Sequence, residues 1–142
     1  ATSGTRILGG ERIALVRVQG MPAVVDATVD RWFTKAGQER LPAEVEKVRQ
    51  MILATPVEGF CGSGAAIRDM DLRDLHRRIR VSTLLLVGEH DPGTPVAAAE
   101  AIHAGIAGSQ LRIFSAAAHF CNVEQAERFN ETLLDFLKQH DG

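Results

Sequence analysis

The feature that most constrains the fold is the segment Ser82–Gly88, an unbroken apolar run between turn-forming residues. Such a run predicts a strand buried on both faces, as in a parallel sheet. A helix beginning at Pro95, a second strand at Leu111–Phe114 and a last helix over Val123–Leu137 are predicted after it. This order is a βαβα unit, whose crossover is expected to be right-handed.

Two parallel strands do not form a stable sheet alone, because their faces and edges need cover. The 142 residues suffice for one ordinary domain but not for a complete large α/β enzyme. We therefore expect the βαβα unit to be the end of a larger sheet whose other strands lie outside this sequence.

Before the first strand the sequence predicts helices. Gly20 is expected to end the first of them, and another is expected over Ala23–Phe33. Pro22 suits a first helical turn, and Pro42 opens another helix, which has one apolar face. That face comprises Val45, Val48, Met51 and Ile52.

Composition and charge exclude several classes of function. There are 16 Lys and Arg against 18 Asp and Glu, a net charge of −2, which does not favour nucleic acid or an anionic membrane as a partner. No apolar run approaches the roughly 20 residues needed to cross a bilayer, and no secretion signal is recognisable. The two cysteines make no disulfide framework, so the expected location is cytoplasmic. The histidines and cysteines lack metal-ligand spacing, so neither a metal nor a cofactor is predicted.

Two polar loops follow the predicted strands and hold the candidate catalytic residues, Asp91 and His119. Each alone has a plainer interpretation: Asp91 as a turn residue or helix cap, and His119 as an ordinary loop histidine. Both, however, follow strands at the same edge of one sheet, where α/β proteins place their ligands and catalytic groups. A carboxylate that binds one imidazole nitrogen leaves the other free to act as a base.

A nucleophile to complete this pair is missing. Hydrolases of the α/β type order their triad as Ser, then Asp or Glu, then His, with the Ser in a G-x-S-x-G turn after a strand. Ser63 departs from that motif and follows a predicted helix. Cys61 and Cys121 are better explained as small buried residues than as nucleophiles.

Several stretches of the sequence are characteristic. The most specific is Asn122–Phe129, which follows Ala118 and His119. The others are Arg31–Thr34, Met51–Thr55, Glu58–Phe60, Ala66–Asp74 and Thr83–Pro92. In these stretches the sequence resembles the C-terminal part of 3-oxoadipate enol-lactone hydrolases, α/β hydrolases of the β-ketoadipate pathway of aromatic-compound catabolism.

The resemblance implies an incomplete α/β fold, with a helical cap followed by the C-terminal βαβα portion of an α/β-hydrolase sheet. Residues 1–10 would be the end of a preceding core segment, 11–67 the cap and 68–142 the C-terminal core segment. It also implies hydrolysis of an enol-lactone to 3-oxoadipate by a Ser-Asp-His mechanism. The Ser would come from outside this chain, and the chain alone would be inactive.

The substrate and partner follow from the same resemblance. The lactone carries a carboxylate, which a cation in the cap would position; Arg31 is the candidate, beside Trp32, although Arg31 facing water is an equal interpretation. Phe120 would line the pocket or only anchor its loop. The expected partner is an N-terminal half that carries the Ser, or a second copy of the chain.

Two alternatives remain open at this stage. Another cap-bearing α/β hydrolase, such as an esterase, a haloperoxidase-like enzyme or a C–C hydrolase, would share Asp91 and His119. A non-catalytic interaction module, or half of a split protein, would instead use its exposed sheet edge to recruit a partner.

Overall fold

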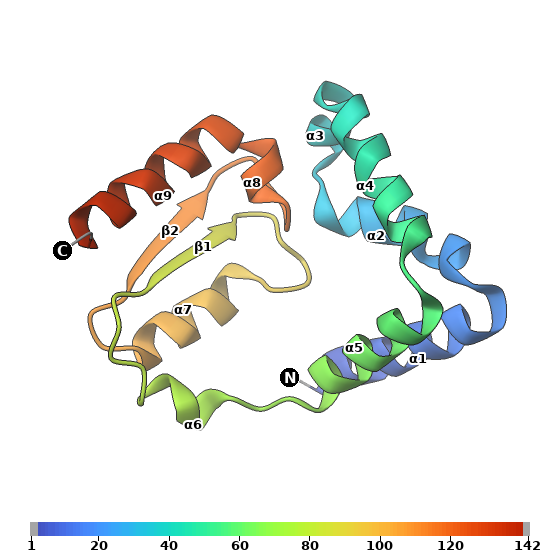
Figure 1. Ribbon diagram of the computed structural model, residues 1–142, viewed down its shortest axis with the longest axis horizontal. Coiled ribbons are helices and arrows are strands. Elements are labelled where there is room, and N and C mark those ends of the chain that lie inside the picture. The colour runs from blue at the N-terminus through green and yellow to red at the C-terminus, as the bar shows by residue number, and fades with distance from the viewer. Residues whose placement is uncertain (1–2, 141–142) are drawn as a thin grey trace. The chain divides into compact units, whose positions relative to one another are not determined.

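The computed structural model describes residues 3–140 of the chain, with side chains from residue 10 onward, and divides them into two compact units. The first comprises residues up to Val29 together with Ala43–Leu72, and the second comprises Asp30–Pro42 together with the residues from Arg73 onward. Figure 1 traces the elements of both.

The first unit is helical. Its elements are α1 (Ser3–Gln19), the 3-10 turn η1 (Met21–Val24), the first part of α2 (Val25–Trp32), α4 (Pro42–Ala54) and α5 (Val57–Asp69). Helices α1 and α5 lie side by side (Figure 1). Gly20 ends α1 as predicted, and its φ of 74° is a conformation that a residue with a side chain rarely adopts.

The core of the first unit is built mainly from valines. The buried apolar residues are Val16, Met21, Val24, Val25, Val29, Val45, Val48, Ile52 and Cys61. Met51 was predicted on the apolar face of α4, but its side chain is 69% exposed. The prediction was wrong because α4 turns a narrower stripe inward, in which Ile52 follows Val45 and Val48.

The second unit contains the sheet. Strands β1 (Leu84–Gly88) and β2 (Gln110–Phe114) are parallel and in register, with Leu84 opposite Gln110 and Gly88 opposite Phe114. Helix α7 (Val96–Gly105) connects them and α9 (Ala126–His140) follows, and the two helices flank the sheet on opposite sides in Figure 1. The βαβα order was therefore predicted correctly. Short helices α3 (Lys35–Arg40), α6 (Arg73–His76) and α8 (Cys121–Glu124) complete the unit.

The predicted last helix over residues 123–137 is two helices, because the chain turns at Gln125 between α8 and α9. The side chain of Glu124 points inward at this turn, and helix α9 then restarts at Ala126. Leu137, at the end of the predicted helix, is 46% exposed. The apolar residues of α9 that do pack, Phe129 among them, reach the core formed by Phe114.

The predicted core segment ended at residue 10, and the predicted cap ended at residue 67. Residues 1 and 2 lie outside the described residues, and from Ser3 the chain is one continuous helix across the predicted boundary at residue 10. Residues 30–42, inside the predicted cap range of 11–67, pack with the sheet-bearing unit. The assignment of residues 11–67 as a cap stays a prediction.

Candidate active site

The site lies beyond the carboxyl ends of β1 and β2, on the loops after the two strands. The loops are joined by backbone hydrogen bonds, from Glu89 N to Phe114 O and from His90 N to Ala117 O, both 2.9 Å long. Gly88 permits this approach, since a Cβ there would lie 2.0 Å from Ala118 O. The sequence thus brings both loops together through a residue without a side chain.

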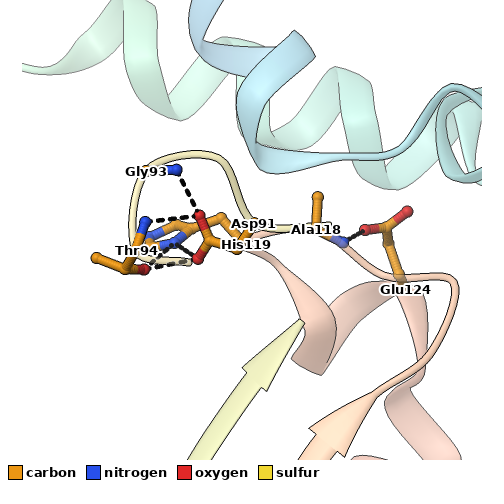
Figure 2. Close-up of polar contacts among 6 residues, drawn as sticks. All are labelled: Asp91, Gly93, Thr94, Ala118, His119 and Glu124. Carbon is orange, nitrogen blue, oxygen red and sulfur yellow. Dashed lines mark hydrogen bonds and ion pairs between the residues drawn. The ribbon is translucent and has the colours of Figure 1, made fainter. Parts of the chain in front are cut away.

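Asp91 and His119 meet at this edge of the sheet, as the sequence predicted. Oδ2 of Asp91 lies 2.7 Å from Nδ1 of His119 (Figure 2). An ionised carboxylate can only accept hydrogen bonds, so the proton of this contact belongs to Nδ1. That tautomer leaves Nε2 of His119 with a free lone pair, which is what a general base requires.

The carboxylate is enclosed, whereas the imidazole is open. The side chain of Asp91 is 3% exposed and that of His119 is 40% exposed. Oδ1 of Asp91 accepts from the backbone N–H groups of Gly93 at 2.8 Å and Thr94 at 2.9 Å. Oδ2 accepts from Thr94 Oγ1 at 2.6 Å as well as from His119.

These bonds determine the charge of Asp91. Burial works to raise its pKa, but the hydrogen bonds from Thr94, His119 and Gly93 together outweigh burial and lower the pKa below its ordinary value. Asp91 is therefore ionised at neutral pH, when it both orients the imidazole and stabilises its charged form.

Both sequence interpretations of Asp91 have a counterpart in the structure. One oxygen makes the turn contacts to Gly93 and Thr94, and the other faces His119. Asp91 does not cap α7, because that helix begins after Pro95 without a side-chain cap. The role of Thr94 was missed, although a Thr three residues after an Asp in a turn is a recognisable signal.

Aromatic rings cluster beside the imidazole. Trp32 stacks on Phe120 with ring centroids 4.6 Å apart, and each of these rings has its centroid 6.1 Å from that of His119. Phe33, which is buried, meets Phe120 edge-on at 5.5 Å. The backbone N–H of Phe120 also donates to Trp32 O at 2.9 Å. Trp32 and Phe120 thus both lie next to His119 and offer it an apolar, planar surround.

Arg31 precedes Trp32 on α2 and is half-buried, and this burial lowers the pKa of its guanidinium.

Ser63 lies inside α5, in the first unit, rather than in a turn after a strand. Cys121 is buried, which raises the pKa of its thiol and disfavours the thiolate that a nucleophile needs. Residues 10–140 contain no group of side chains able to hold a metal ion. No helix within residues 3–140 combines the length and apolarity that a membrane span requires.

Known proteins resemble this chain in sequence and in structure. No family model matches the chain. The chain is 32% identical to 3-oxoadipate enol-lactonase 2 of Acinetobacter baylyi over 90% of its own length and 48% of that protein. Its structure resembles the enol-lactonase of Burkholderia xenovorans LB400, with a TM-score of 0.87, 34% identity, and 90% of this chain and 49% of that chain covered. It also resembles a thermophilic esterase of Thermogutta terrifontis, with a TM-score of 0.88, 26% identity, and coverage of 98% and 52%.

The fold of the chain is therefore that of a partial α/β hydrolase, and its relatives are hydrolases. Within that class the chain resembles the C-terminal halves of 3-oxoadipate enol-lactonases. It spans about half the length of the relatives that it matches.

Proposed function

We propose that the chain supplies the acid and base of a Ser-Asp-His hydrolase that opens a 3-oxoadipate enol-lactone. The observation that carries this proposal is the 2.7 Å contact between Asp91 Oδ2 and His119 Nδ1, with Nε2 left free. The resemblance to enol-lactonases supports the choice of a lactone over other esters.

In the proposed reaction, Nε2 of His119 removes the proton of a Ser hydroxyl that lies outside this chain, while the Ser oxygen attacks the lactone carbonyl. The ester C–O bond of the ring then breaks, and the ring oxygen takes the proton from His119 and leaves as the enol, still joined to the Ser through the acyl group. His119 next takes a proton from water, whose oxygen attacks the acyl carbonyl; the Ser oxygen leaves with that proton, and the released enol tautomerises to 3-oxoadipate. Asp91 stays ionised throughout and stabilises each imidazolium.

Substrate contacts are proposed for Arg31, Trp32 and Phe120. Arg31 is half-buried and makes no ion pair or side-chain hydrogen bond within residues 10–140, so its charge is available to a carboxylate of the substrate. Trp32 and Phe120 lie beside His119 and would pack on the planar, unsaturated ring of the lactone.

The partner that we propose is an N-terminal half carrying the Ser. The chain corresponds to about half of its relatives' length, and β1 pairs on one edge only within residues 3–140. Beside β1, its residues and those of α7 line an apolar groove of about 410 Å³. A neighbouring strand on the free edge would cover this surface, while self-association would cover it with a second copy.

Both cysteines are free, which supports a reducing, cytoplasmic location.

The test combines this chain with the N-terminal half of an enol-lactonase and follows hydrolysis of 3-oxoadipate enol-lactone. Lactonase activity is expected for the combination, and neither half should turn over alone. The variant His119→Ala should lose the activity, whereas His90→Ala, which changes an exposed histidine on the neighbouring loop, should keep it. Turnover by the 142-residue chain alone, or activity that survives His119→Ala, would contradict the proposal.

A second candidate is an esterase, because the similarity to the thermophilic esterase is as close in fold as that to the enol-lactonase. The same Asp91 and His119 would serve it. A panel of simple carboxylic esters and enol-lactones on the combined halves separates the two: preference for uncharged esters, unchanged in Arg31→Gln, would favour the esterase.

A further inference from the structure

Glu124 is a buried carboxyl group that the proposed reaction does not use. Its residue is 1% exposed, at the end of α8. Oε2 accepts from the backbone N–H of Ala118 at 2.7 Å (Figure 2), and Oε1 accepts from N of Thr34 at 3.0 Å and from Oγ1 of Thr34 at 2.5 Å. All three partners are donors, so both oxygens act as acceptors.

The hydrogen bonds of Glu124 connect Thr34 with the loop that holds His119, two segments that lie far apart in the sequence. Ala118 directly precedes His119, and Phe120 directly follows it. The N–H of Ala118 donates to Glu124, whose carboxyl also binds Thr34, and the N–H of Phe120 donates to Trp32 O. The backbone on both sides of His119 is therefore bonded, directly or through Glu124, to the segment that contains Trp32 and Thr34. The backbone N–H of Glu124 also donates to Phe120 O at 2.9 Å, which closes the loop on itself.

The position of the Glu124 carboxyl is fixed from other directions too. Thr34 Oγ1 accepts from the N–H of Gly37 at 2.9 Å, so its own proton is directed to Glu124. A Cβ at Gly37 would lie 1.9 Å from Oε1 of Glu124, so α3 packs its bare backbone against the carboxyl. Arg40 donates from Nη2 to the backbone O of Glu124 at 2.8 Å.

We propose that Glu124 is a positioning residue that keeps His119 Nδ1 bonded to Asp91. It touches no reacting atom and acts through the N–H of Ala118, with Thr34 as the second anchor of its carboxyl. The imidazole itself is 40% exposed, and the position of its backbone sets how Nδ1 meets Asp91. The proposal rests on the Asp91–His119 geometry and not on lactonase activity.

The test is Glu124→Gln in the 142-residue chain. Gln has the same length, but its amide nitrogen only donates, so at least one of the three donors loses its acceptor. Two signals are read by NMR: the exchange rate of the Ala118 amide, and the ring ¹⁵N shifts of His119 in alkaline buffer, which report which nitrogen holds the proton. His119→Gln assigns the ring signals among the five histidines.

In Glu124→Gln we expect Ala118 exchange to rise roughly tenfold, as loss of one hydrogen bond predicts. We also expect His119 to lose its preference for the proton on Nδ1. Glu127→Gln, an exposed change on α9, should alter neither signal. A wild-type His119 spectrum in Glu124→Gln would overturn the proposal.

If Glu124 only stabilises the fold, an equally destabilising substitution elsewhere in the unit should change the His119 ring signals in the same way. Phe129→Leu tests this. Phe129 packs against Phe114 in the core of the same unit, and its side chain makes none of the hydrogen bonds that hold Glu124. If Phe129→Leu with the same loss of thermal stability changes the His119 ring signals equally, the effect is general loosening and the proposal fails. Where Glu124→Gln does not fold, Thr34→Val should shift the His119 signals partway and Thr34→Ser should restore them; a wild-type spectrum in Thr34→Val would equally refute it.

Discussion

Thr94 Oγ1 and His119 Nδ1 both donate to one oxygen of Asp91, at 2.6 and 2.7 Å. The hydroxyl and the imidazole are themselves 3.3 Å apart, so the three groups form a compact triangle. One carboxylate oxygen thus accepts hydrogen bonds both from a residue of its own loop and from the base that it orients.

We expect Thr94→Val to raise the pKa of Asp91 relative to the wild type. The change removes the hydroxyl donor that, with the backbone bonds and His119, offsets burial. Thr94→Ser keeps the hydroxyl and is the matched control. The measurement is a ¹³C NMR titration of the Asp91 carboxyl; equal titration curves for Val and Ser at this position would contradict the role assigned to Thr94.

Stability should fall at low pH partly through Asp91. Because its pKa in the folded chain lies below the ordinary value of 3.8, its ionised form stabilises the fold above that pH. This contribution is lost as pH falls through the lowered pKa. Asp91→Asn should lower stability by about 1–3 kcal/mol near neutral pH, since buried donors lose their charged acceptor.

The measurement is the urea midpoint of unfolding from neutral pH down to acid for the wild type and Asp91→Asn. The difference between the two should shrink below pH 3.8. Asp135→Asn, on the exposed side of α9, serves as the control for a generic loss of one carboxylate. A difference that stays constant across the whole range would be inconsistent with the lowered pKa.

Gly37→Ala should destabilise the sheet-bearing unit by about 1–3 kcal/mol, the usual effect of overpacking. The added methyl group would overlap the Glu124 carboxyl, whose position three donors fix. Gly62→Ala is the matched helical control, since a Cβ at Gly62 meets nothing within 4 Å. That control should gain up to about 1 kcal/mol from helix propensity. Thermal unfolding of both variants is the measurement, and equal shifts would argue against the close contact.

Cys121 should react with iodoacetamide at least about tenfold more slowly than free cysteine at the same pH, because burial both blocks access and raises its pKa. Mass spectrometry of peptides after timed alkylation gives the rate. Denatured chain provides the reference for full reactivity. Rapid labelling of Cys121 in the folded chain would revive it as a candidate nucleophile.

The strand-level prediction succeeded because local sequence dominates there. A continuous apolar run is enough to define β1, and the chain order of strand, helix and strand then places Asp91 and His119 at one edge. The two residues are 28 positions apart, yet the topology of a parallel pair leaves them little choice.

Glu124 and α3 were missed for a different reason. Nothing in a local pattern separates an inward-pointing glutamate from the exposed ones of a helix, and here burial depends on Thr34, 90 positions earlier. Met51 was misassigned because helical spacing indicates a face but not its width.

The close approach at Gly88 has a consequence for protein engineering. The acid's strand and the base's loop are connected through backbone atoms, by His90 N to Ala117 O and Glu89 N to Phe114 O. The atoms that make these two bonds are present whatever side chains stand at positions 89, 90, 114 and 117. Asp91 and His119 can therefore be treated as one unit in design: the rings of Trp32 and Phe120 could be varied for new substrates while the acid and the base keep their contact, provided that position 88 stays Gly.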